Sequence, residues 1–122
     1  MKVDITPENI TITPAIDQYL ELRLSAIGKY IDADDESAKA DVYLVKTTEH
    51  HKQGKIFKAK INLHVSGWSG QAEAVDENLY NAINEMKSEI IRQLKTHKKK
   101  NRTKERKEGM KIKKMLRGWW SE

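Results

Sequence analysis

The chain has 122 residues, of which 38% are hydrophobic and 34% are charged, and it contains no cysteine. This length suits one domain with a compact core, and the absence of cysteine excludes disulfides and thiolate metal sites. No stretch approaches the roughly 18 apolar residues that a membrane-spanning helix needs. The N-terminus has no apolar run of the kind that marks a secretory signal. We therefore expect a soluble, cytoplasmic protein.

Charge is distributed unevenly along the chain. Residues 95–122 hold 12 Lys and Arg against 3 Asp and Glu, a net charge of +9, whereas residues 1–94 hold 11 against 15, a net charge of −4. A strongly basic end of this kind predicts a polyanionic partner. We divide the chain into a folded domain, residues 1–97, and a basic, partly helical or disordered tail, residues 98–122.

A short strand and an amphipathic helix are predicted first. Residues 2–5 alternate in polarity and predict a strand that ends at Pro7. Thr13 and Pro14 are typical of a helix start, with a capping hydroxyl followed by proline at the first helical position. Apolar residues then recur at a spacing of three or four and give the helix one apolar side: Ile16, Leu20, Leu24, Ile27 and Ile31.

Three strands and a second helix follow. Residues 41–48 are rich in β-branched side chains, and residues 56–65 alternate strictly, which predicts one buried and one solvated face. Residues 66–70 predict a turn, and residues 71–75 the return strand. Asp76 is positioned to cap a helix whose apolar stripe consists of Leu79, Ile83, Met86, Ile90 and Leu94.

The order of these elements predicts an α+β fold. We expect β-α-β-β-β-α, with two helices packed on one face of a four-stranded sheet. The first strand–helix–strand unit makes strands 1 and 2 parallel if they are neighbours, with a right-handed crossover.

Three segments in this order resemble a known family. ITPAIDQYLELRLSAIGKYI, LHVSG and LYNAINEMKSEIIRQLKTHKKK are together similar to the short form of the ribosome hibernation-promoting factors, also described as ribosome-associated translation inhibitors or ribosomal subunit interface proteins. The resemblance covers residues 1–100. It implies a double-stranded-RNA-binding-like fold, no enzymatic activity and no cofactor.

The resemblance also implies a partner, the small ribosomal subunit with its 16S rRNA and ribosomal proteins. Binding would lie in the channel that holds mRNA and the tRNAs, and would block translation and protect idle ribosomes under stress. Long members carry a further dimerisation domain that pairs ribosomes. Because the present sequence has no such segment, we expect a monomer when free that does not pair ribosomes by itself.

The resemblance assigns RNA-facing positions to Arg23 and Lys29 of the first helix and to Arg92, Lys98 and Lys100 of the second. Tyr80, Ala82 and Ile83 match the start of the second helix. Two positions where many members carry lysine are Ala26 and Glu89 here. The folded part therefore looks poorer in phosphate contacts than its relatives.

Helical projection alone places Ser88, Arg92, Lys95 and Lys99 opposite the apolar stripe of the second helix. Such a cationic ridge suits phosphate contact, because each neutralised phosphate releases counterions. An ordinary solvated helix face is the alternative, and Glu89 favours it. The complete set of predicted RNA-binding residues is Arg23, Lys29, Arg92, Lys95, Lys98, Lys99, Lys100, Arg102 and Lys104.

The basic tail has two parts. Residues 98–108 hold no apolar side chain and form either a solvated helix extension or a disordered segment. Beyond Gly109, apolar residues at helical spacing include Trp119. This part either folds onto ribosomal RNA or protein, with Trp119 or Trp120 stacking on a base, or lies on an anionic membrane, or docks on its own domain or a second copy.

No catalytic or metal chemistry emerges. His50 and His51 point their rings apart, and no carboxylate or cysteine completes a ligand pattern. Trp68, at a hairpin tip, is expected to cover the sheet edge and not to stack on a base. We expect no small-molecule substrate. Two other functions stay open: a shape-selective RNA-binding protein unrelated to ribosomes, and a membrane-surface or assembly adaptor acting through the tail.

Overall fold

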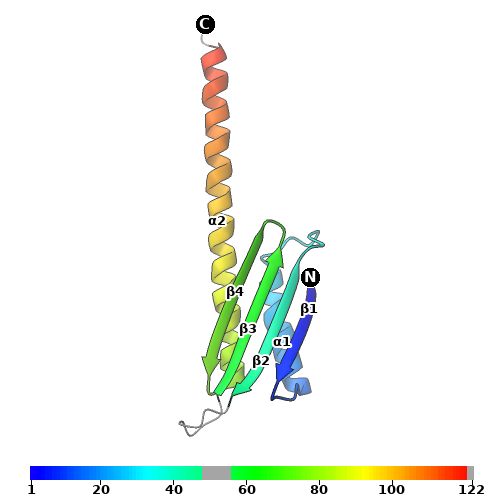
Figure 1. Cartoon of the computed structure of the whole chain (residues 1–122). Coiled ribbons are helices and arrows are strands. Elements are labelled where there is room, and N and C mark those ends of the chain that lie inside the picture. Colours follow the sequence, from blue (N-terminus) through cyan, green and yellow to red (C-terminus); the bar gives the residue numbers. More distant parts are fainter. Residues whose placement is uncertain (48–55, 121–122) are drawn as a thin grey trace.

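The computed structural model describes residues 1–47 and 56–120, and within residues 101–120 it describes only the course of the helix. The elements follow the predicted β-α-β-β-β-α order, which confirms the α+β fold class (Figure 1). Their bounds are β1 (Lys2–Glu8), α1 (Pro14–Gly28), β2 (Lys39–Thr47), β3 (Ile56–Val65), β4 (Trp68–Asp76) and α2 (Leu79–Trp120).

The strands form one four-stranded sheet in the order β1-β2-β3-β4. β1 pairs with β2 in parallel, as predicted, and the other pairs are antiparallel. Both helices lie behind the sheet on the same face (Figure 1). Pro7 lies within β1 and does not end it, contrary to the sequence prediction. An edge strand tolerates proline, because the side that lacks the N–H donor can face away from the neighbouring strand.

The β3–β4 turn is tighter than predicted. Val65 pairs with Trp68, which leaves only Ser66 and Gly67 in the turn. Gly67 has φ +77, a backbone conformation that glycine adopts without steric cost. β4 therefore begins at Trp68, three residues earlier than the sequence predicted.

Both helices begin at side-chain caps. The Thr13 hydroxyl accepts a hydrogen bond from the Ile16 N–H at 3.2 Å, as expected. In α2 the cap is Asn78 and not Asp76, because Asn78 directly precedes the first helical residue. Its Oδ1 accepts from the Tyr80 N–H at 2.9 Å, while Asp76 accepts from the Asn78 N–H at 2.8 Å. Each helix thus starts with backbone donors satisfied.

One core lies between the sheet and the helices. The predicted stripe residues Ile16, Leu20, Leu24 and Ile27 of α1 are buried, and so is the whole predicted stripe of α2, from Leu79 to Leu94. The buried side chains of β2 and β3 face them: Ala40, Val42, Leu44, Ala59, Ile61, Leu63 and Val65. Each fully buried Leu or Ile contributes about 1.5–3 kcal/mol, so this layer fixes where both helices lie.

Helix α2 continues beyond the domain. It passes Gly109 without interruption and ends at Trp120 (Figure 1). Residues 98–108 are thus helical here, and the proposed boundary at 97/98 stays a prediction. Among the described residues, no helix is long and apolar enough to cross a membrane.

Candidate nucleic-acid interface

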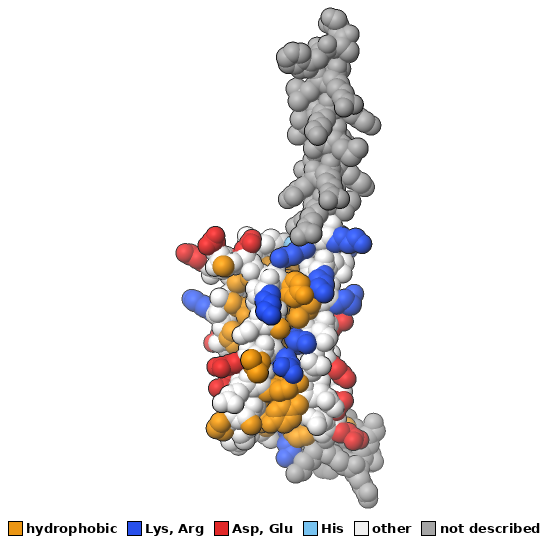
Figure 2. Space-filling view, turned by 180° about the vertical axis from the view of Figure 1, so that it is seen from behind, with side chains coloured by type: hydrophobic (Ala, Val, Ile, Leu, Met, Phe, Trp, Pro, Cys, Tyr) orange, Lys and Arg blue, Asp and Glu red, His pale blue; other side chains and the backbone are white. Residues whose placement is uncertain are grey.

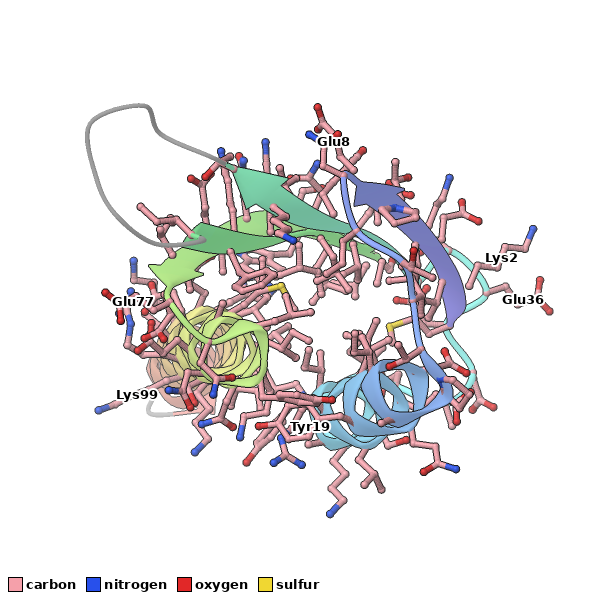
Figure 3. The ribbon with its side chains drawn as sticks, turned by 90° about the horizontal axis from the view of Figure 1, so that it is seen from below. Lys2, Glu8, Tyr19, Glu36, Glu77 and Lys99 are labelled. Carbon is pink, nitrogen blue, oxygen red and sulfur yellow. The ribbon has the colours of Figure 1, made fainter. Side chains whose placement is uncertain are left out.

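Aromatic and cationic side chains meet where α1 and α2 run side by side. The rings of Tyr19 and Tyr80 contact each other edge to face, with centroids 5.0 Å apart. Figure 3 shows Tyr19 between the two helices. The guanidinium of Arg23 lies 4.0 Å from the centroid of the Tyr19 ring, within cation–π distance. Tyr19, packed against Tyr80, thus holds the charge of Arg23 at the line where the helices meet.

A second cation–π contact joins α2 to the segment that directly follows α1. The Nζ atom of Lys95 lies 5.3 Å from the centroid of the Tyr30 ring, which follows α1. Lys98 and Tyr30 line one hollow, so Lys98 also belongs to this side of α2. Lys95 therefore extends the cationic line that Arg23 begins. Lys98 lies at the end of this line, in a hollow that is also lined by four acids: Asp32, Asp34, Asp35 and Glu36.

Lys87 lies between these two contacts along helix α2. It follows Tyr80 by seven residues, close to two helical turns, so it shares that side of α2. Lys87 is half-buried, as when a lysine packs its methylene stem and leaves the ammonium in water. We call the following set the interhelical surface: Tyr19, Arg23, Tyr30, Tyr80, Lys87, Lys95 and Lys98.

Basic and acidic side chains occupy different parts of the helical face. Lys and Arg side chains gather along the middle of this face, and Asp and Glu lie toward its margins (Figure 2). The Nε atom of Arg23 is buried without a hydrogen-bond partner among the described residues. The terminal nitrogens of the guanidinium are therefore the groups that can meet an anion. A line of fixed cations with apolar neighbours suits a polyanionic backbone.

Arg92 and Lys100 lie on the opposite flank of α2, facing β4. They line a hollow of about 450 Å³ with Trp68, Gln93 and His97. Gln93 ties α2 to the sheet edge, since its Nε2 donates to the Gln71 carbonyl at 2.9 Å. The residues that projection grouped as one ridge thus lie in two environments.

The carboxylate of Glu89 holds Arg92. The Arg92 Nη2 and Nε atoms donate to its two oxygens at 2.6 and 3.0 Å. These bonds, followed by one from Gln93, lower the pKa of Glu89 to about 2, and the same pair raises the pKa of Arg92. Both groups are therefore charged at neutral pH, and Arg92 is partly neutralised.

Trp68 agrees with the prediction for it. It is half-buried against the core, and its indole stacks on His97 with centroids 5.5 Å apart and planes at 26°. The ring covers Gly70, where an added Cβ would collide with it. Trp68 therefore covers the sheet edge.

The remaining predicted residues lie elsewhere. Lys29 is exposed at the end of α1, and Lys99 is exposed on the side of α2 away from α1 (Figure 3). The side chains of Arg102, Lys104, Trp119 and Trp120 fall outside the described side chains, and His50 and His51 lie outside the described residues. Among residues 1–47 and 56–100, no group of three side chains is placed to hold a metal.

Sequence reasoning assigned no RNA-facing role to four members of the interhelical surface: Tyr19, Tyr30, Lys87 and Tyr80, the last of which it named only as a match to the start of the second helix. One signal was present, because Tyr19 and Arg23 are four residues apart and such pairs meet on a helix. Tyr30 and Lys87 gain their roles only from the placement of α1 against α2.

Comparison with known proteins settles the family. A family model described as Sigma 54 modulation protein / S30EA ribosomal protein matches residues 3–102. This chain belongs to that family. The resemblance to ribosome hibernation-promoting factors is thereby confirmed, because several matching relatives carry that name.

Two relatives show how much of the chain is shared. The ribosome hibernation promoting factor of Klebsiella oxytoca is 32% identical over 100 residues, which cover 82% of this chain and 96% of the relative. The ribosome hibernation promotion factor of Bacillus subtilis is 28% identical over 109 residues, 89% of this chain. The match covers 54% of the Bacillus protein, so the chain spans about half its length.

Solved structures share the fold. The N-terminal domain of Thermus thermophilus Protein Y is 28% identical, with a TM-score of 0.64 over 80% of this chain and 99% of that one. A ribosomal subunit interface protein from Coxiella burnetii is 18% identical, with a TM-score of 0.63 over 80% and 98%. At that identity, the second similarity supports the fold alone.

Proposed function

We propose that this protein binds ribosomes in the cytoplasm and keeps them translationally inactive, as the names of its relatives suggest. The observation that carries the proposal is the interhelical surface. There Arg23 and Lys95 are held against tyrosine rings at 4.0 and 5.3 Å from the ring centroids. Cations fixed in this way meet phosphates without first being ordered, and ordering a long side chain costs about 1.5–2 kcal/mol.

The finer proposal is that the helical face lies in the mRNA and tRNA channel of the small subunit, against 16S rRNA. Cations in a line contact the sugar–phosphate backbone and read its shape, because double-helical RNA hides its base edges. Inhibition is then steric. The protein occupies the path of mRNA and tRNA as a monomer and turns over no substrate.

Sedimentation with purified subunits tests the proposal. We expect the protein to travel with the small subunit on sucrose gradients and not with the large one. Prior loading of the subunit with mRNA and tRNA should displace it, since all three would share one channel. Binding that is unchanged by mRNA and tRNA would contradict the channel site.

A shape-selective RNA-binding role unrelated to ribosomes is the second candidate. The interhelical surface favours it equally, because backbone contacts carry no sequence information. A free RNA duplex of about 20 base pairs separates the two. Equal affinity for this duplex and for the small subunit would favour the second candidate.

A further inference from the structure

A hollow of about 760 Å³ lies at the end of the domain where both helices begin, the end that faces the viewer in Figure 3. It is formed by the β1–α1 connection, the paired ends of β2 and β3, and the start of α2. The apolar part of its lining consists of Ile10, Ile16, Phe57, Leu79 and Tyr80. Ile16 and Leu79 are buried in the core, which fixes this part of the wall. Proteins bind small ligands in largely apolar hollows of about 300–1,000 Å³.

The hollow also has polar groups. Its lining includes one lysine and four exposed polar side chains: Lys46, Asn9, Thr11, Glu77 and Asn78. The Asn78 Oδ1 atom accepts the Tyr80 N–H at 2.9 Å, which leaves the N–H groups of its amide for a ligand. Lys46 and Glu77 are the charged groups of the lining, one of each sign, so the lining carries no net charge. The hollow is therefore suited to an uncharged molecule with polar edges and not to a phosphate.

Tyr80 belongs both to this hollow and to the interhelical surface. Its ring contacts that of Tyr19, with centroids 5.0 Å apart, and Tyr19 in turn holds Arg23 at 4.0 Å. Tyr80 is 37% exposed, so it still offers ring surface to a ligand. Hydrophobic side chains gather at the lower end of the helical face, below the line of Lys and Arg (Figure 2). A cationic line that leads to an uncharged hollow matches a nucleotide, in which a charged phosphate is joined through the sugar to an uncharged base.

We propose that this hollow binds an unpaired nucleobase of the RNA whose backbone lies along the interhelical surface. The inference rests on the proposed function and adds to its backbone contacts a site for a base. Phe57 and Tyr80 supply aromatic surface for the plane of the base, and Asn9, Glu77 and Asn78 supply donors and acceptors for its edge. An apolar protein side chain fits less well, because it would cover these polar groups without forming hydrogen bonds to them.

Partly filling the hollow tests the site by affinity. Thr11→Leu adds a branched side chain to the lining at an exposed position, so it should exclude a base without disturbing the core. Small-subunit affinity should fall about 5-fold or more, since a stacked base contributes about 1–3 kcal/mol, at tenfold per 1.4 kcal/mol. The salt slope should stay within about 0.5 of the parent, because no phosphate contact is lost. The matched control Thr6→Leu, exposed on β1, should keep the parent's affinity.

Ultraviolet cross-linking of the unmodified protein to small subunits identifies the occupant. Aromatic rings that contact a base form covalent cross-links to it under irradiation, and the linked peptides are identified by mass spectrometry. Phe57 is the decisive ring, because it lines the hollow and is not part of the interhelical surface. We expect a 16S rRNA nucleotide on the peptide that contains Phe57, its loss in Thr11→Leu, and none on Tyr43, which lies on the outer face of the sheet.

The other outcomes are distinguishable. A cross-link at Tyr80 without one at Phe57 would overturn the base in the hollow and leave the proposed function standing, as would parental affinity of Thr11→Leu. A loss of affinity in Thr11→Leu with no rRNA cross-link at Phe57 would replace the base with a protein partner. Failure of the parent protein to bind small subunits would overturn the proposed function and, with it, this inference.

Discussion

The cations on the two faces of the protein are held in different ways. On the outer face of the sheet, Lys39 and Lys58 are paired with acids, and Lys60 lies 5.9 Å from the centroid of the Tyr43 ring, a longer contact than those of the helical face. Lys39 Nζ lies 3.4 Å from Asp4 and 3.7 Å from Asp41, and Lys58 lies 3.1 Å from Glu73. On the helical face, Arg23 and Lys95 lie over tyrosine rings. A carboxylate cancels the charge that it orders, whereas an aromatic ring orders a cation and leaves its charge to a partner.

Under the proposed function, this difference favours the helical face over the sheet as the surface that contacts RNA. The hydrogen bond that Lys39 donates to Asp4, followed by the charge of Asp41, raises the pKa of Lys39. Glu89 brings the same arrangement to the helical layer, where it pairs with Arg92. The helical layer therefore contains both arrangements: Arg92 is paired with a carboxylate, whereas Arg23 and Lys95 lie over tyrosine rings.

The largest expected effect comes from the basic extension of α2. Removing residues 98–122 deletes 11 Lys and Arg, of which roughly three to six should contact phosphate. The salt slope of small-subunit binding should therefore shallow by about 3–5. The control Trp119→Ala, Trp120→Ala should weaken binding without changing the slope, because stacking releases no ions. An unchanged slope after truncation would mean that the extension does not contact RNA.

Removing the carboxylate at position 89 should convert a paired cation into an available one. Glu89→Gln keeps the shape of the side chain and frees Arg92, so the salt slope should steepen by about 1. The matched change on the sheet, Glu73→Gln, frees Lys58 and should leave the slope unchanged. Equal changes in the salt slope for Glu89→Gln and Glu73→Gln would show that a cation on the helical face contributes no more to RNA binding than one on the sheet.

Replacing a tyrosine should reveal how much the ring contributes. Tyr19→Leu keeps bulk but loses the cation–π contact with Arg23, worth about 0.5–1 kcal/mol at an exposed site. RNA affinity should fall about 2–5-fold, at tenfold per 1.4 kcal/mol, with the slope retained. Tyr43→Leu removes the corresponding contact of Lys60 on the sheet and is the control. Equal losses for both variants would contradict the comparison.

The smallest effect concerns stability in acid. Because the pKa of Glu89 falls from 4.5 to about 2 on folding, its ionised form stabilises the protein above pH 4.5, and this contribution is lost as the pH falls toward 2. Between pH 5.5 and 2.5, the melting temperature of Glu89→Gln should therefore fall less than that of the parent. Equal falls would show that the Glu89–Arg92 pair adds nothing to stability.

Periodicity predicted the parts of the fold that depend on local pattern. The apolar stripes of α1 and α2 and the strand over residues 56–65 agree with the structure, because burial on one face imposes a period on the sequence. The start of β4 was misplaced, since Ser66 to Gly70 has turn composition. Pairing of Ser69 with His64 across the hairpin extends the strand, and local composition does not contain that pairing.

The site was less predictable than the fold. Projection grouped Arg92 with Lys95, although the structure turns Arg92 toward β4 and Lys95 toward Tyr30. Projection treats one helix alone, whereas the two flanks of α2 differ only through their neighbours. Lys87 was missed for the same reason, because half-burial beside a second helix is a tertiary property.

One measurement tests the central claim most directly: the salt dependence of small-subunit affinity for two triple variants of equal charge. Arg23→Gln, Lys87→Gln, Lys95→Gln alters the interhelical surface, and Lys39→Gln, Lys58→Gln, Lys60→Gln alters the sheet. We predict that the first variant shallows the slope by about 2–3 and that the second changes it by less than about 0.5. Equal changes in the two slopes, with both melting temperatures near that of the parent, would contradict the account.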